Sequence, residues 1–299
     1  MKDFDVSELK KLYFPPPDSH KGQNGKLLLI GGSHLFHAAS LWALKVASRI
    51  VDMVFYSSVP ENNQIVLEAK KEFRDGIVVP RKQLESYIDE ADCVLIGPGM
   101  VRSEHGMSNI KYPMSNIQEI NQIQDEGEQT YYLTKYLLTK YPQKIWVIDG
   151  GALQMMEKEW LKDMPEVILT PHHGEFERLF ELVPTQENIE KMAREYSAII
   201  LCKGEEDIVC LPGEALAAGE CVAVKGGNAG MTKGGTGDVL AGLVAALACK
   251  NDLYLAAKAG SYINKKAGEA LFQRVGYTFN SSDLVNEIPK VMRELLPIT

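Results

Sequence analysis

Short apolar runs recur along this chain, each ending in glycine or a polar residue and most followed by a helical pattern. Clear examples are Lys26–Ile30, Val94–Gly99, Ile145–Asp149 and Ser197–Lys203. Apolar runs of four to eight residues that are bounded by turn residues are typical of strands buried on both faces. Their alternation with helices predicts an α/β fold, with a mostly parallel central sheet and helices on both faces.

The other segments fit the same plan. Further strands are expected at 54–59, 77–79, 166–172, 208–211 and 221–224, and helices at 38–50, 131–140 and 175–181. No stretch rich in Pro, Gly and Ser divides the chain, so we expect residues 1–299 to form a single domain. The polar segment 102–130 is expected to be a surface insertion within that domain.

Polar residues and glycines follow the predicted strands. In an open parallel sheet, ligands bind outside the carboxyl ends of the strands. The residues found there include Ser33, Gly99, Asp149, His172 and Lys203. We therefore expect a ligand site along this edge of the sheet.

The densest run of glycines, at 226–237, leads directly into an apolar helical pattern that starts at Asp238. Glycine lets the backbone approach a ligand closely, and N–H groups at a helix N-terminus bind anions. The candidate anion hole consists of Gly234, Gly235, Thr236 and Gly237. Asp238 by itself could serve only as a helix cap, but a helix cap does not require three glycines before it. At the edge of a phosphate site, Asp238 is a candidate catalytic base.

The spacing of these glycines excludes two common nucleotide-binding motifs. It is not a Walker loop, because Lys233 precedes the glycines, and it is not the Gly-x-Gly-x-x-Gly dinucleotide fingerprint. It resembles the Gly-x-Gly-Asp anion hole of ribokinase-like enzymes. Asn228-Ala-Gly-Met, followed by Gly-Gly-Thr-Gly-Asp-Val-Leu-Ala-Gly at 234–242, resembles the ADP/ATP-dependent (S)-NAD(P)H-hydrate dehydratase family in particular.

The resemblance implies a surface for hydrated NADH or NADPH. Its residues would be Ala39, Gly99, His172 and Asp238. Gly99 ends a Gly-Pro-Gly turn, and His172 lies in Thr-Pro-His-His-Gly-Glu, which resembles the family's Thr-Pro-His-x-Gly-Glu. Without the resemblance, Gly-Pro-Gly could simply form a tight turn, and His172 could simply be a surface histidine.

A second set of residues resembles the family's site for the AMP part of the nucleotide. The segment Lys-Gly-Glu-Glu-Asp at 203–207 resembles the family's Lys-Gly-x-x-Thr. The nucleotide-binding residues would be Lys203, Gly204, Glu205, Glu206, Asp207 and Gly237. Two positions depart from the family pattern. Asp207 replaces a threonine and would add negative charge near phosphate, and Gly151 stands where a second acid is usual.

The resemblance implies a hydro-lyase that repairs hydrated NADH or NADPH, with ADP or ATP as co-substrate and Mg²⁺ as cofactor. The ring hydroxyl would be phosphorylated with Asp238 as base, and phosphate would then be eliminated. It also implies a homo-oligomer, namely a homotetramer, without the N-terminal epimerase domain that some members carry. Two alternatives stay open: a kinase of a small sugar or vitamin alcohol, and a non-catalytic nucleotide-binding paralogue.

Composition narrows the choice of partners and compartment. A net charge of −8 argues against nucleic acid and membrane surfaces as partners. No apolar run approaches the ~20 residues of a membrane helix, and no secretory signal is recognised. The five cysteines are scattered without a Cys-x-x-Cys pair. We therefore expect buried thiols in a cytoplasmic protein.

Overall fold

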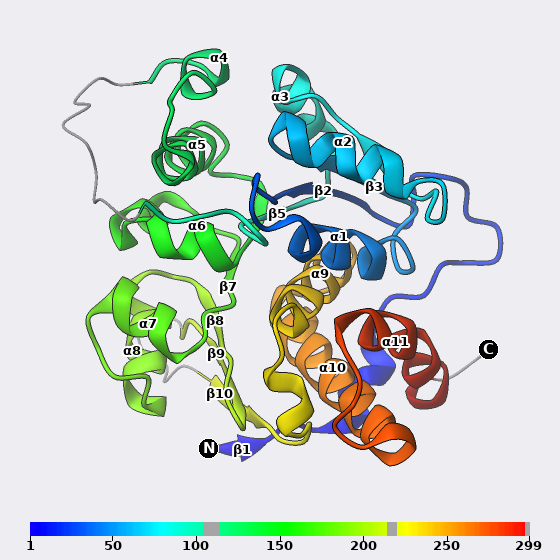
Figure 1. Cartoon of the computed structure of the whole chain (residues 1–299). Helices are drawn as coiled ribbons and strands as arrows, with labels where there is room; N and C mark the ends of the chain where they lie inside the picture. Colours follow the sequence, from blue (N-terminus) through cyan, green and yellow to red (C-terminus); the bar gives the residue numbers. More distant parts are fainter. Residues whose placement is uncertain (104–113, 214–219, 297–299) are drawn as a thin grey trace.

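The computed structural model of the protein describes residues 1–103, 114–213 and 220–296. Within them, ten strands form one sheet in the order β1-β10-β9-β8-β7-β6-β5-β2-β3-β4 (Figure 1). The strands are β1 (Lys2–Asp3), β2 (Lys26–Ile30), β3 (Met53–Ser57), β4 (Ile77–Val78), β5 (Cys93–Ile96), β6 (Ile145–Ile148), β7 (Val167–Leu169), β8 (Ile199–Cys202), β9 (Asp207–Leu211) and β10 (Glu220–Val224). Strand β9 runs antiparallel to both of its neighbours, and the other strand pairs of this sheet are parallel. The predicted mostly parallel sheet is confirmed.

Helices cover both faces of the sheet. They are α1 (His37–Ala47), α2 (Pro60–Ala69), α3 (Leu84–Glu90), α4 (Ile117–Ile120), α5 (Glu126–Lys140), α6 (Gly150–Met155), α7 (His173–Phe180), α8 (Gln186–Glu195), α9 (Thr236–Ala248), α10 (Leu253–Val275) and α11 (Ser281–Leu295). Short 3-10 turns are η1 (Val6–Lys11), η2 (Arg81–Gln83), η3 (Lys158–Asp163) and η4 (Ala229–Thr232).

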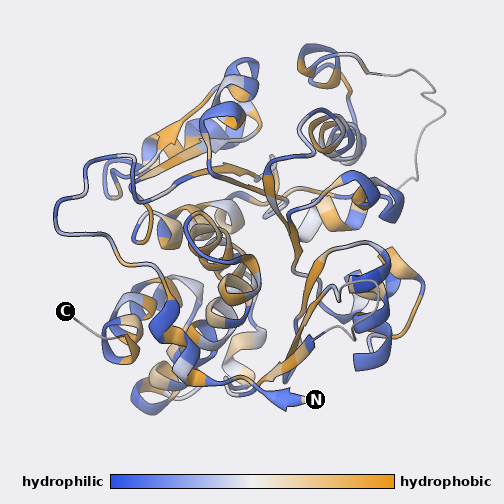
Figure 2. Cartoon of the chain, turned by 180° about the vertical axis from the view of Figure 1, so that it is seen from behind, coloured by the Kyte–Doolittle hydropathy of each residue, from blue (hydrophilic) through white to orange (hydrophobic). Residues whose placement is uncertain are grey.

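The strands separate two hydrophobic cores, because successive side chains of a strand point to opposite faces. In β2, Leu27 and Leu29 belong to the core shared with α1, α9, α10 and α11. Leu28 and Ile30 belong to the core shared with α3, α5, α6, α7 and α8. Figure 2 shows the apolar strands enclosed between helices with polar outer faces. This double burial explains why the strands read as continuous apolar runs.

Close helix crossings fix the position of α9. A Cβ on Gly242 would lie 2.6 Å from Cα of Ala43 on α1, and a Cβ on Gly260 of α10 would lie 2.6 Å from Cγ2 of Val244. Only glycine permits such close approach. The start of α9 is thereby held at the carboxyl edge of the sheet.

Two segments between the strands differ from expectation. Helix α5 begins at Glu126, five residues before the predicted start, and the Asp125 side chain accepts a hydrogen bond from Glu128 N at 2.8 Å. Part of the predicted insertion at 102–130 is therefore helical, and its residues 104–113 lie outside the described residues. Helix α8 was not predicted, because only Ile189, Met192 and Ala193 of its polar sequence are buried.

The cysteines correct one prediction. Cys210 of β9 and Cys221 of β10 lie directly opposite each other in the antiparallel pair and form a disulfide. The expectation of five thiols is wrong for this pair, because the hairpin register brings the two Cα atoms to 4.2 Å. Cys93, Cys202 and Cys249 are buried thiols, as predicted.

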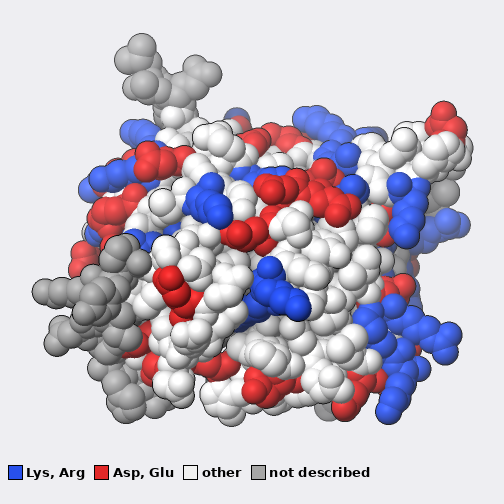
Figure 3. All heavy atoms as spheres, turned by 90° about the horizontal axis from the view of Figure 1, so that it is seen from above, with Lys and Arg blue, Asp and Glu red and all other residues white. Residues whose placement is uncertain are grey.

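On the face shown in Figure 3, acidic and basic side chains are interspersed. No helix in the described ranges is both long enough and apolar enough to cross a membrane.

Candidate active site

The predicted anion hole forms the turn that starts α9. Gly235 is the N-cap residue with φ +96°, and a Cβ there would overlap the ring of Trp42. The hydroxyl of Ser281 donates a hydrogen bond to the Gly234 carbonyl at 2.9 Å, and the Thr236 hydroxyl donates to the carbonyl of Lys233 at 3.0 Å. The N-cap residue, Gly235, has no side chain with which to cap this helix end. The Thr236 N–H donates to the Lys233 carbonyl at 3.4 Å, so the N–H of Gly237 is the one that this turn leaves for an anion among Thr236 and Gly237.

Beside this turn, a partly buried lysine contacts acidic residues that follow two neighbouring strands. Lys203, which follows β8, places Nζ 2.7 Å from Oδ1 of Asp149 and 3.9 Å from Oε2 of Glu175. The same Nζ would lie 3.4 Å from a Cβ on Gly237 of α9. Because β6, β7 and β8 are adjacent, the residues that follow them meet at the anion hole.

These charges act on Asp238, in the first turn of α9. Burial raises the pKa of Asp238 to about 7, the negative charge of Asp149 adds to the rise, and Lys203 opposes it. Burial alone would lower the pKa of Lys203, but Asp149 and Glu175 outweigh it and raise that pKa. A carboxyl group whose pKa is raised toward neutral pH by its surroundings suits a group that accepts a proton.

His172 lies at the start of α7, in a reciprocal cap with Glu175. His172 Nδ1 accepts from Glu175 N at 3.3 Å, and Glu175 Oε2 accepts from His172 N at 2.9 Å. Gln154 Nε2 donates to the other carboxylate oxygen at 3.1 Å. The His172 side chain is exposed, whereas Glu175 is buried. Glu175 is therefore both a helix cap and a partner of Lys203.

Ala39 and Gly99 come together at the ends of β2 and β5. Gly99 has φ +73°, and a Cβ on it would lie 2.8 Å from the carbonyl oxygen of Phe36 and 3.0 Å from Cβ of Ala39. The protein itself therefore requires glycine at position 99.

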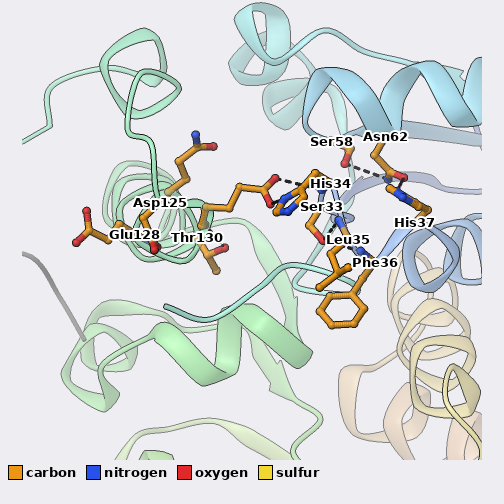
Figure 4. A network of polar contacts seen from close by, with 12 residues as sticks. Ser33, His34, Leu35, Phe36, His37, Ser58, Asn62, Asp125, Glu128 and Thr130 are labelled. Carbon is orange, nitrogen blue, oxygen red and sulfur yellow. Dashed lines mark hydrogen bonds and ion pairs between the residues drawn. The ribbon is translucent and has the colours of Figure 1, made fainter. Parts of the chain in front are cut away.

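The loop at 33–36, which passes this pair, is held by polar contacts (Figure 4). The Ser33 hydroxyl accepts a hydrogen bond from Phe36 N at 2.8 Å, and the Glu126 carboxylate of α5 contacts both the backbone and the ring of His34. Leu35 and Phe36 nevertheless expose 61% and 51% of their surface. Figure 4 shows the Phe36 ring pointing away from the His34 side chain.

The predicted nucleotide residues line one pocket of about 610 Å³. Its walls are residues 203–207, 225–229, Met231, Thr232, Thr236, Gly237, Leu240, Asn264 and Lys265. Lys265 Nζ donates hydrogen bonds to the carbonyl oxygens of Gly204 at 3.2 Å and Glu205 at 2.9 Å. The pocket is thus continuous with the anion hole at Thr236 and Gly237, and its 203–207 wall is fixed by α10.

The charge of Asp207 is neutralised within the protein. Its Oδ1 lies 3.2 Å from Lys265 Nζ and accepts from Gly204 N at 3.0 Å, while Oδ2 accepts from the Ser261 hydroxyl at 2.7 Å. The side chain is buried. The negative charge that Asp207 adds is therefore balanced by Lys265, and the side chain holds the 203–207 segment in shape.

Gly151, at the position where the family pattern has a second acid, faces main chain. A Cβ there would overlap the carbonyl oxygen of Met100. No side chain fits at this position, because the segment that follows β5 occupies the space.

The described residues contain no group of three or more His, Cys, Asp or Glu side chains that could hold a metal ion. The Lys203 ammonium already lies between the carboxylates of Asp149 and Glu175. This donor set suits a cation carried mainly by nucleotide phosphates and water.

The sequence pointed less clearly to several of these residues. In the sequence, Asp149 is only an acidic residue at the end of a strand, and Glu175 is only an acidic residue at the start of a helix. Their common contact with Lys203 arises because β6, β7 and β8 are neighbours in the sheet. Trp42 and Asn264 carried no local signal, because each lies inside a helix.

Comparison with known proteins agrees with this geometry. A family model described as NAD(P)H-hydrate dehydratase matches residues 27–290. A bifunctional NAD(P)H-hydrate repair enzyme of Methanocaldococcus jannaschii is 33% identical over 294 residues, which cover 96% of this chain and 52% of that protein. An ADP-dependent (S)-NAD(P)H-hydrate dehydratase of Nitrosopumilus maritimus is 31% identical, with 92% of this chain and 91% of the relative covered.

Solved structures share the fold. A ribokinase-like protein of Enterococcus faecalis aligns with a TM-score of 0.78 and 22% identity, covering 99% of this chain and 96% of the other. The ADP/ATP-dependent NAD(P)H-hydrate dehydratase of Bacillus subtilis, co-crystallized with ATP/Mg²⁺, aligns with a TM-score of 0.76 and 21% identity, covering 98% of both chains. The chain spans about half the length of the bifunctional relatives. On the match over 27–290, it belongs to the NAD(P)H-hydrate dehydratase family.

Proposed function

We propose that this protein catalyses the ADP- or ATP-dependent dehydration of the S form of hydrated NADH or NADPH and so restores NAD(P)H. The observation that carries the proposal is Asp238, whose pKa is raised to about 7 at the start of α9. Lys203 and a pocket of nucleotide size lie beside it. The name of the Nitrosopumilus maritimus relative supports the same reaction.

The chemistry follows from the poor leaving group in the hydrated ring. Asp238 accepts the proton of the ring hydroxyl as its oxygen attacks the terminal phosphorus of the nucleotide, and the leaving group is AMP when ADP is the donor or ADP when ATP is the donor. The N–H groups of Gly235 to Gly237 stabilise the charge on the transferred phosphoryl group. The lone pair of the ring nitrogen then expels phosphate as the C–O bond breaks, which leaves an iminium ion in the ring. Loss of a proton from the adjacent ring carbon to water then forms the C=C double bond of the reduced nicotinamide.

The two ligands would occupy opposite sides of Asp238. Ala39, Gly99 and His172 would contact the hydrated dinucleotide, whereas Lys203, Gly204, Glu205, Glu206 and Gly237 would contact the AMP part of the nucleotide. Asp207 would act on the nucleotide by holding this segment in shape.

The proposal includes Mg²⁺, which the nucleotide phosphates and water would hold with few protein ligands. The cation would neutralise phosphate charge during transfer. We also propose a cytoplasmic location and a homo-oligomer, specifically a homotetramer.

The substitution Asp238→Asn tests the proposal. We expect it to reduce dehydration about 10²–10⁴-fold while ADP still binds, because the base is lost but the pocket remains. Recovery of reduced-nicotinamide absorbance from hydrated NADH, with ADP or ATP, measures the rate. Asp163→Asn, which removes an exposed carboxylate in η3, is the matched control.

The outcomes separate the alternatives. Activity within a few-fold of the parent would exclude Asp238 as the base. Nucleotide binding by the parent without turnover would support a non-catalytic paralogue, and phosphorylation of a small alcohol without dehydration would support a kinase.

A further inference from the structure

The ammonium of Lys203 has more hydrogen-bonding capacity than its protein partners use. Its side chain is 17% exposed, and Nζ donates one hydrogen bond, to Oδ1 of Asp149 at 2.7 Å. Oε2 of Glu175 lies at 3.9 Å, which is within ion-pair distance but too far for a hydrogen bond. An ammonium carries three N–H groups, so two of them have no acceptor among the described residues. Lys203 also lines the pocket of about 610 Å³, so this capacity is available to a ligand.

The same ammonium borders an open space at the start of α9. Of the described atoms outside the neighbouring residues and the α9 backbone, only Nζ of Lys203 lies within 4 Å of a Cβ placed on Gly237, at 3.4 Å. Gly237 has no positive φ, unlike Gly235. Neither the backbone conformation nor the packing therefore requires glycine at position 237. A ligand group in this space explains the glycine, because a Cβ would exclude that group.

This space adjoins the proposed base. Asp238 follows Gly237 in the first turn of α9, and the charge of Lys203 opposes the rise that burial causes in the pKa of Asp238. In the proposed reaction, the hydroxyl oxygen that loses its proton to Asp238 attacks the terminal phosphorus. The terminal phosphoryl group therefore lies within reach of Asp238, where the N–H of Gly237 and the ammonium of Lys203 can both donate to its oxygens.

We infer that Lys203 is a catalytic residue that donates hydrogen bonds to the terminal phosphoryl group during transfer, rather than a contact of the AMP part. The inference rests on the proposed function, since it assigns one group of that site. Lys203 acts as a hydrogen-bond donor and keeps its proton, while the proton of the attacking hydroxyl goes to Asp238. Burial favours the neutral amine, but Asp149 and Glu175 raise the pKa of Lys203, so the group stays charged.

Isothermal titration calorimetry with ADP and AMP shows which part of the nucleotide Lys203 contacts. In Lys203→Met the affinity for ADP should fall about tenfold or more, because a charged hydrogen bond to the terminal phosphoryl group is lost. The affinity for AMP, which lacks that group, should stay within about threefold of the parent. If only ATP supports turnover, ATP and ADP are compared in the same way. Lys191→Met, which removes an exposed ammonium of α8, is the control and should bind each nucleotide as the parent does.

The rate of dehydration gives a second readout. Lys203→Met should lower kcat about 10²–10³-fold, since the lost donor acts on charge that develops in the transition state. Lys203→Arg keeps a positive charge and should recover part of this loss. Gly237→Ala tests the space itself, because its methyl group would fill it without a clash inside the protein. This variant should keep the urea midpoint of the parent and lose affinity for ADP.

The opposite results overturn the inference. Equal losses of ADP and AMP affinity in Lys203→Met would place the ammonium at the AMP part, and a parental kcat would remove it from catalysis. Parental ADP affinity in Gly237→Ala would place the phosphoryl group outside this space. If Lys203→Met does not fold, because Asp149 loses its partner, Lys203→Met combined with Asp149→Asn gives the same binding comparison. A parent that binds neither ADP nor ATP would instead refute the proposed function.

Discussion

At the scale of single residues, the charge state of Asp238 is the central property of this site. A carboxyl group in solution is ionised at neutral pH, but burial and Asp149 raise the pKa of Asp238 to about 7. The base form is the deprotonated one, so kcat for dehydration should rise with pH up to about 7 and level off above it.

Asp149→Asn should move this acidic limb below pH 7. The substitution removes the negative charge that raises the pKa of Asp238 and leaves Lys203, which lowers it. The pH dependence of kcat between pH 5 and 9 measures the shift. Glu175→Gln, which removes a weaker contribution, should move the limb less. An acidic limb that stays at pH 7 in Asp149→Asn would contradict the assignment.

The residues of the anion hole were predictable because their signal is local. Glycines before an apolar helical pattern specify a turn and a helix start within a few residues of each other. The partnership of Asp149, Glu175 and Lys203 was not predictable, because it depends on which strands are neighbours in the sheet.

At the scale of elements, the start of α9 depends on a single backbone conformation. Gly235 has φ +96°, and a Cβ would overlap Trp42, whereas nothing lies within 4 Å of a Cβ on Gly234. Gly235→Ala should therefore destabilise the fold by roughly 1–3 kcal/mol and reduce activity, because the turn must shift. Gly234→Ala should change stability by no more than about 0.5 kcal/mol.

Urea denaturation of the two variants and the parent measures these differences. Equal stabilities of Gly234→Ala and Gly235→Ala would show that α1 does not constrain the anion hole.

Elements with a strong apolar pattern were predictable, and those with a weak pattern were not. The strands β2, β5 and β6 could be identified from the sequence. Both of their faces are covered by helices, so their sequences are continuous apolar runs. Helix α8 buries only one narrow stripe, so its composition is that of a loop. The antiparallel direction of β9, which pairs Cys210 with Cys221, is set by its neighbours in the sheet.

At the scale of the whole molecule, we expect the chain to associate. Light scattering after size exclusion should give four times the 33.2 kDa of one chain. The loop at 33–36, with its exposed Leu35 and Phe36, gives apolar surface that a partner copy or a substrate can cover. A mass of one chain at all concentrations tested would refute the homotetramer.

The contact between Gly151 and Met100 also limits the evolutionary history open to this chain. The second acid of the family pattern cannot be introduced by one substitution, since any side chain at position 151 overlaps main chain. Reversion would first require a different path for the residues after β5. The path of the main chain after β5 therefore demands glycine at this position, and a library that varies position 151 alone should recover only glycine.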